Sequence, residues 1–111
     1  MNIEPAKYTH DDFLAYLMIY AASADFTITE KEKAHIINLL GKDEFDKMNG
    51  LFRSQNDIEH IETLQMLFAK FKDQYESKEE VIAKMRQIFK LEHDEFNPLE
   101  QELILMLNKI L

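Results

Sequence analysis

The chain has 111 residues, 46% of them hydrophobic and 31% charged, which fits one folded domain and excludes a disordered chain. Acidic residues number 21 and basic residues 13, and the net charge of −8 disfavours nucleic acid and anionic membrane surfaces as partners. The chain has no cysteine, so disulfides and zinc–thiolate sites are excluded and a cytoplasmic location is expected. The longest apolar run covers residues 13–22, about half of what a membrane span needs, so no membrane insertion is expected.

Helix starts recur along the chain as an N-cap residue followed three positions later by an acid. In chain order these pairs are Thr9 with Asp12, Thr29 with Glu32, Ser77 with Glu80, and Asn97 with Glu100. The cap side chain accepts a hydrogen bond from an unpaired backbone N–H, and the acid reaches back and complements the positive helix end. Asp43 and Asn56 are further candidate starts. Gly41 and Gly50 follow apolar segments and are predicted to end helices in the left-handed conformation.

These signals predict about six helices and an all-α single-domain bundle over residues 1–111. The predicted helices cover residues 10–24, 30–40, 44–52, 57–74, 78–90 and 98–110. The fourth has one apolar stripe, formed by Ile58, Ile61, Leu64, Leu67, Phe68 and Phe71. The first and last helices are apolar around the whole circumference, so we expect both to be buried and to pack against each other at the centre, with Leu105 inside.

Two acidic turns share a spacing. Residues 21–32 hold small residues that end in Asp25, followed by the apolar Ile28 and by Glu32 in the next helix. Residues 92–100 hold a looser copy with Asp94, Phe96 and Glu100, in which His93 takes the place of the first acid.

This arrangement resembles the TerB-like (tellurite-resistance TerB) helical domains. The matching residues are Ala21, Ala22, Ala24, Asp25, Ile28 and Glu32, with Phe96 and Glu100 in the second turn. The glycine that follows the family's first acid is Phe26 here, and a phenylalanine disfavours a positive φ. The resemblance implies an all-α fold, an acidic surface as a candidate for divalent cations, and a role in stress-associated complexes rather than in catalysis.

The expected function is therefore that of a non-enzymatic, acidic interaction domain with an unidentified protein partner. We expect weak binding of calcium or magnesium, with Asp25, Glu32, Asp94 and Glu100 as the candidate ligands. The alternative is a metal-dependent hydrolase that uses the same carboxylates. A third interpretation is that these acids only cap helices and solvate the surface.

Other side chains leave further alternatives open. His10, His35, His60 and His93 are scattered, and no pair has the spacing of a helical metal site. The segment around Phe45, Met48 and Phe52 fits either the core or a partner surface. Tyr16 and Tyr20 lie one turn apart, and their hydroxyl groups need partners if buried, from Asp25 or from solvent.

Overall fold

The computed structural model describes residues 5–23, 28–74 and 79–83, together with residues 105, 108 and 109. Within these ranges the chain is mostly helical and no strand occurs, which confirms the all-α prediction. Residues 79–83 are also helical, where the fifth helix is predicted. The elements with defined bounds are the 3-10 helix Pro5–Lys7, α1 (His10–Ala22), α2 (Glu30–Leu40), α3 (Lys42–Arg53), α4 (Asp57–Phe71) and the 3-10 helix Lys72–Gln74.

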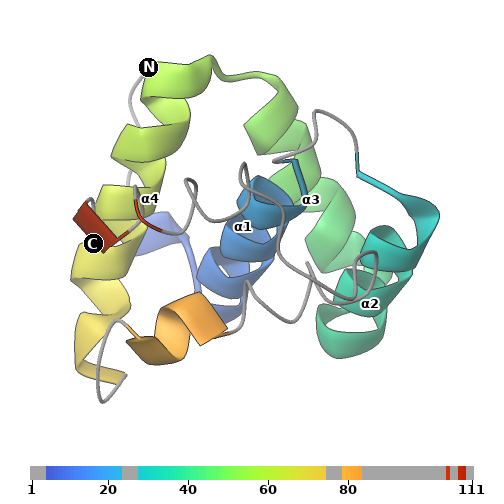
Figure 1. Ribbon diagram of the computed structural model, residues 1–111, viewed down its shortest axis with the longest axis horizontal. Coiled ribbons are helices and arrows are strands. Elements are labelled where there is room, and N and C mark those ends of the chain that lie inside the picture. The colour runs from blue at the N-terminus through green and yellow to red at the C-terminus, as the bar shows by residue number, and fades with distance from the viewer. Residues whose placement is uncertain (1–4, 24–27, 75–78, 84–104, 106–107, 110–111) are drawn as a thin grey trace.

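Helix α1 contacts α2, α3 and α4, and Figure 1 shows it between α4 on one side and α2 and α3 on the other. Nine of its 13 residues are buried, because a helix that is apolar around its circumference loses surface to neighbours on several sides. Phe13, Tyr16, Leu17 and Ile19 are fully buried. The first helix is thus buried as predicted.

The predicted last helix, over residues 98–110, lies almost wholly outside the described residues, and so does its expected packing against α1. Leu105 is described, and its side chain is 61% exposed, so the prediction that it is buried is wrong. Successive helical residues project at about 100° to one another, and an unbroken apolar run therefore turns some side chains away from any neighbour that covers only part of the circumference.

Three of the predicted caps are confirmed as reciprocal capping boxes. At α1 the Thr9 hydroxyl accepts from the Asp12 N–H at 3.2 Å, and the Thr9 N–H donates to the Asp12 carboxylate at 2.8 Å. Thr29 and Glu32 form the same pair of bonds at α2, and Asn56 and Glu59 form it at α4. The predicted caps Ser77 and Asn97 lie outside the described residues.

The Thr29 cap gives a direct test of this local chemistry. Thr29→Ala removes the hydroxyl that accepts from the Glu32 N–H at 3.2 Å, and we expect unfolding to become easier by about 1 kcal/mol. Thr29→Ser keeps the acceptor and should retain most of the stability. Urea unfolding at a constant m-value measures both changes, and equal midpoints for the two variants would show that this cap does not hold the helix.

The glycine predictions are only partly correct. Gly41 ends α2 with a φ of 102°, which favours glycine, but its ψ of 153° is extended rather than left-handed helical. Gly50 does not end a helix, because α3 continues to Arg53. Leu51 and Phe52 pack against the core, and this packing outweighs the weak helix propensity of a single glycine.

Two further predictions are corrected in α3 and α4. Asp43 is not a cap, because α3 begins at Lys42 directly after Gly41, so Asp43 lies in the first turn. Ile58 does not belong to the buried stripe of α4, since its side chain is 69% exposed. It lies two positions before the buried His60, and two positions correspond to about 200° around a helix, nearly the opposite face.

Candidate functional site

Of the four candidate metal ligands, the structure describes only Glu32. Asp25, Asp94 and Glu100 lie outside the described residues. Glu32 is 4% exposed, and its carboxylate accepts a hydrogen bond from the Thr29 N–H at 2.9 Å. It therefore serves as a capping residue of α2. In the described part of the chain no three His, Asp or Glu side chains lie close enough together to hold a metal ion.

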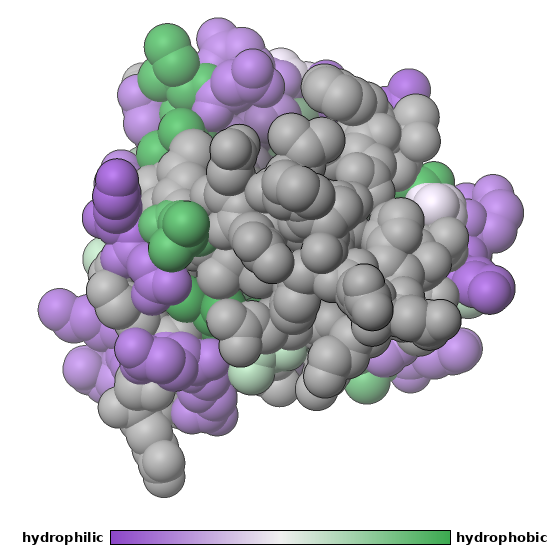
Figure 2. Space-filling model, in the orientation of Figure 1, coloured by the Kyte–Doolittle hydropathy of each residue, from purple (hydrophilic) through white to green (hydrophobic). Residues whose placement is uncertain are grey.

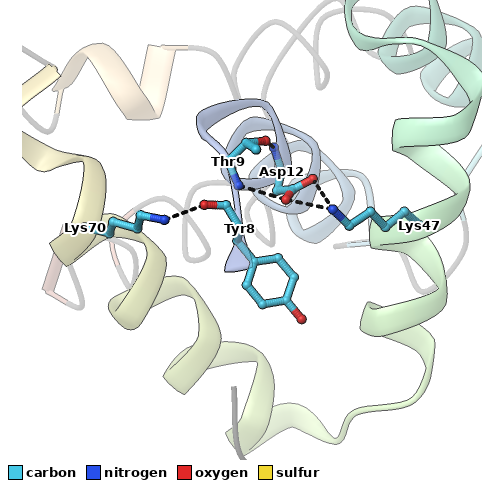
Figure 3. Close-up of polar contacts among 5 residues, drawn as sticks. All are labelled: Tyr8, Thr9, Asp12, Lys47 and Lys70. Atoms are coloured by element: carbon cyan, nitrogen blue, oxygen red, sulfur yellow. Dashed lines mark hydrogen bonds and ion pairs between the residues drawn. The ribbon is translucent and has the colours of Figure 1, made fainter. Parts of the chain in front are cut away.

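A buried carboxylate lies instead at the start of α1. Asp12 is 1% exposed, and besides its bond to Thr9 it accepts from the Lys47 ammonium, with N–O distances of 2.9 and 3.1 Å. Figure 3 shows this side chain at the junction of α1 and α3. The Lys47 side chain is 51% exposed, so this ion pair has one buried partner and one partner at the surface.

Asp12 forms an acidic pair with the half-buried Glu44, one turn before Lys47 on α3. Burial and the hydrogen bond with Asp12 raise the pKa of Glu44 to about 7. Burial also acts to raise the pKa of Asp12, but the hydrogen bonds from Thr9, Glu44 and Lys47 outweigh it and leave that pKa below its ordinary value. The hydrogen bond to Asp12 raises the pKa of Lys47. Of the two carboxyl groups, Glu44 rather than Asp12 therefore takes up the proton first as the pH falls through about 7.

The residues before α1 are held from two sides. The Lys70 ammonium of α4 donates to the carbonyl oxygen of Tyr8 at 2.6 Å, and the Lys47 ammonium of α3 lies 5.7 Å from the centre of the Tyr8 ring. Figure 3 shows Tyr8 between these two lysines. These contacts fix the entry into α1, so Tyr8, Asp12 and the two lysines form a structural cluster.

A polar network crosses the core between α1 and α4. The Tyr16 hydroxyl donates to the Gln55 side-chain carbonyl at 2.6 Å, and the Gln55 amide donates to the Thr63 hydroxyl at 2.7 Å. Burial raises the pKa of Tyr16, so the hydroxyl stays protonated and keeps its role as donor. The Tyr16 hydroxyl, for which the sequence suggests Asp25 or solvent as the partner, is thus paired with Gln55.

The histidines serve in packing where their contacts are defined. His60 stacks on Phe52 with ring centroids 3.8 Å apart, and its Nε2 atom lies 2.8 Å from the Phe52 carbonyl oxygen. His10 contacts Phe71 edge to face. His35 has a buried Nε2 atom that lacks a hydrogen-bond partner. His93 lies outside the described residues.

A pocket of about 370 Å³ opens on the described surface. It lies where the end of α1 meets the beginning of α2 and one side of α3, from Phe45 to Arg53. Its lining combines apolar side chains with both signs of charge, and consists of Ser23, Ile28, Glu30, Lys33, Phe45, Asn49, Phe52 and Arg53. The Lys33 ammonium lies 5.7 Å from the centre of the Phe45 ring, a cation–π distance.

The sequence leaves open whether the segment around Phe45 and Phe52 belongs to the core or to a partner surface, and its side chains take part in both the core and the pocket. Phe45 and Met48 are buried in the core, while Leu51 and Phe52 are half-buried and pack against it. Phe45 and Phe52 also line the pocket. Sequence reasoning missed Lys33, Asn49 and Arg53 as pocket residues, because the pocket depends on the crossing of two helices and no local motif signals it.

No protein-family model, curated protein or solved structure matches this chain. The resemblance to the TerB-like domains therefore stays a prediction that depends on the residues quoted for it. None of the described helices is long and apolar enough to cross a membrane. The described side chains at the edge of the face drawn in Figure 2 are mostly hydrophilic, with a few hydrophobic ones between them.

Proposed function

We propose that this chain is a non-enzymatic, acidic helical interaction domain of the TerB-like kind, which binds a protein partner in a cytoplasmic stress-associated complex. The observation that carries the proposal is the pocket between α2 and α3. Its lining combines the apolar side chains of Ile28, Phe45 and Phe52 with charged side chains, and protein recognition sites likewise combine apolar and polar groups.

Crosslinking in the cells that make the protein tests this proposal. The partner captured by the wild-type chain should be lost from a variant with Lys33→Glu and Arg53→Glu, because both changes reverse the charge of a side chain that lines the pocket. The matched control is Lys31→Glu with Lys42→Glu, which changes the charge equally at two exposed positions outside the pocket. A wild-type chain that captures no partner in stoichiometric amounts would contradict the proposed function.

The proposal includes weak binding of a divalent cation at Asp25, Glu32, Asp94 and Glu100. The spacing of these four acidic residues in the sequence supports this part of the proposal. The net charge of −8 also favours the binding of a cation. We expect a dissociation constant of about 10⁻⁴–10⁻³ M, the range of loosely built calcium sites. Calcium at tenfold the dissociation constant should then stabilise the fold by about 1.4 kcal/mol, if only the native state binds it.

Thermal unfolding with and without about 10 mM calcium, at constant ionic strength, measures this effect. A variant with Asp25→Asn and Glu32→Gln should lose most of the increase in Tm. Glutamine at position 32 is still able to accept from the Thr29 N–H, so the cap of α2 is retained. An equal increase in this variant, or none in the wild type, would leave these acids as capping and solvating residues only.

A further inference from the structure

The charged side chains that line the pocket between α2 and α3 indicate the charge of the ligand that it binds. Among the described residues that line it, Lys33 and Arg53 are cationic and Glu30 is anionic. This local excess of positive charge occurs in a chain with 21 acidic and 13 basic residues. The described lining of the pocket therefore has more positive than negative side chains, although the protein as a whole is acidic.

The two cations come from different helices and face one cavity. Lys33 lies in the first half of α2, and Arg53 is the last residue of α3. Lys33 has its ammonium over the Phe45 ring, which keeps a positive charge next to an apolar side chain of the lining. Asn49 adds an amide that is able to both donate and accept. A ligand that satisfies all these groups has an apolar part flanked by carboxylates.

We infer that the pocket receives an aromatic side chain from an acidic segment of the partner protein, and that acids on either side of this aromatic residue pair with Lys33 and Arg53. The inference rests on the proposed function, because it names the chemistry of the partner. The cavity of about 370 Å³ has room for one large side chain, and aromatic anchors in such pockets are typical centres of protein interfaces. Charged rims in turn determine which partner is accepted.

A short acidic peptide tests this inference, because the net negative charge of the protein should otherwise weaken its binding. The probe is a blocked pentapeptide with a central phenylalanine and two acidic residues on each side. The matched control has the corresponding amides in place of the acids. Long-range repulsion from a chain of net charge −8 should make the acidic peptide the weaker ligand, unless Lys33 and Arg53 attract it locally.

Titration of the full chain, followed by backbone amide chemical shifts, measures both affinities. We expect the acidic peptide to bind at least about tenfold more tightly than the amide peptide, with the largest shifts at the pocket residues. The variant with Lys33→Gln and Arg53→Gln should abolish this preference, whereas Lys31→Gln, at an exposed position outside the pocket, should keep it. Glu30→Gln should strengthen binding of the acidic peptide, since it removes an anion from the described lining.

Equal affinities for the two peptides, absence of binding, or shifts centred outside the pocket would overturn the inference. Such a result leaves the proposed function standing if the wild-type chain still captures a partner in cells through another surface. Failure to capture any partner contradicts the proposed function itself, so the two failures are distinguishable. Thermal unfolding of each variant shows whether it is folded. Glu30→Gln is expected to increase the affinity for the acidic peptide, and an unfolded variant would not give that result.

Discussion

Gln55→Leu should destabilise the protein by about 2–5 kcal/mol, the largest effect that we expect from a single polar substitution. Leucine has a similar size but offers no hydrogen bond, so the buried Tyr16 hydroxyl loses its acceptor at 2.6 Å and the buried Thr63 hydroxyl loses its donor at 2.7 Å. Each buried polar group left without a partner costs about 1–3 kcal/mol. Urea unfolding should show a lower midpoint at an unchanged m-value.

A double-mutant cycle separates the network from simple packing. Tyr16→Phe in the Gln55→Leu background removes the unpaired hydroxyl, so the second change should cost less there than in the wild type, or restore some stability. The control is Gln65→Leu on the exposed side of α4, which we expect to change stability by less than about 0.5 kcal/mol. If Gln55→Leu and Gln65→Leu unfold at the same denaturant concentration, the network contributes nothing to stability.

The sequence predicts the described helices well because their boundaries are set by neighbours along the chain. The capping boxes at Thr9, Thr29 and Asn56 join residues only three positions apart, so both partners of each bond are visible in one short segment. The buried first helix is equally local, since it depends on a continuous apolar run. These are features in which local preference and tertiary packing agree.

The errors arise where tertiary packing overrides a local signal. A glycine after an apolar segment commonly ends a helix, but at Gly50 the helix continues, and Leu51 and Phe52 of its last turn reach the core. In α4 the buried face includes His60 and Thr63 and leaves Ile58 exposed. Thr63 binds Gln55, so a polar side chain takes a core position that hydropathy assigns to apolar residues.

The candidate sites depend on long-range contacts that the sequence does not show. Asp12 is recognisable as a capping acid, but its partner Lys47 is 35 positions away and belongs to an ordinary charged helix. The Tyr16–Gln55 bond joins residues 39 positions apart. No periodicity or motif marks either pair, and the same holds for the two helices that supply Lys33 and Arg53 to the pocket. The spacing that suggests Glu32 as a metal ligand equally fits the cap that it forms.

The acidic pair at the start of α1 should make stability depend on pH in two opposite directions. Glu44 has a folded pKa of about 7, above the ordinary value of 4.5, so the native state holds this proton more tightly than the unfolded state. Its contribution is complete below about pH 4.5 and is lost as the pH rises through 7. Asp12 has a lowered pKa, so its contribution is present above pH 3.8 and is lost as the pH falls through its folded pKa.

Glu44→Gln should therefore flatten the upper part of the pH profile, because glutamine resembles the protonated carboxyl group and carries no charge at any pH. We expect the variant to be more stable than the wild type by about 2 kcal/mol at pH 8.5, after allowance for solvent screening of this half-buried group, and nearly equal at pH 5. Asp46→Gln, at an exposed position on the same helix, is the control for the loss of one negative charge. Urea unfolding between pH 5 and 8.5 gives the profile, and parallel curves for Glu44→Gln and wild type would mean that Asp12 and Glu44 do not share a proton.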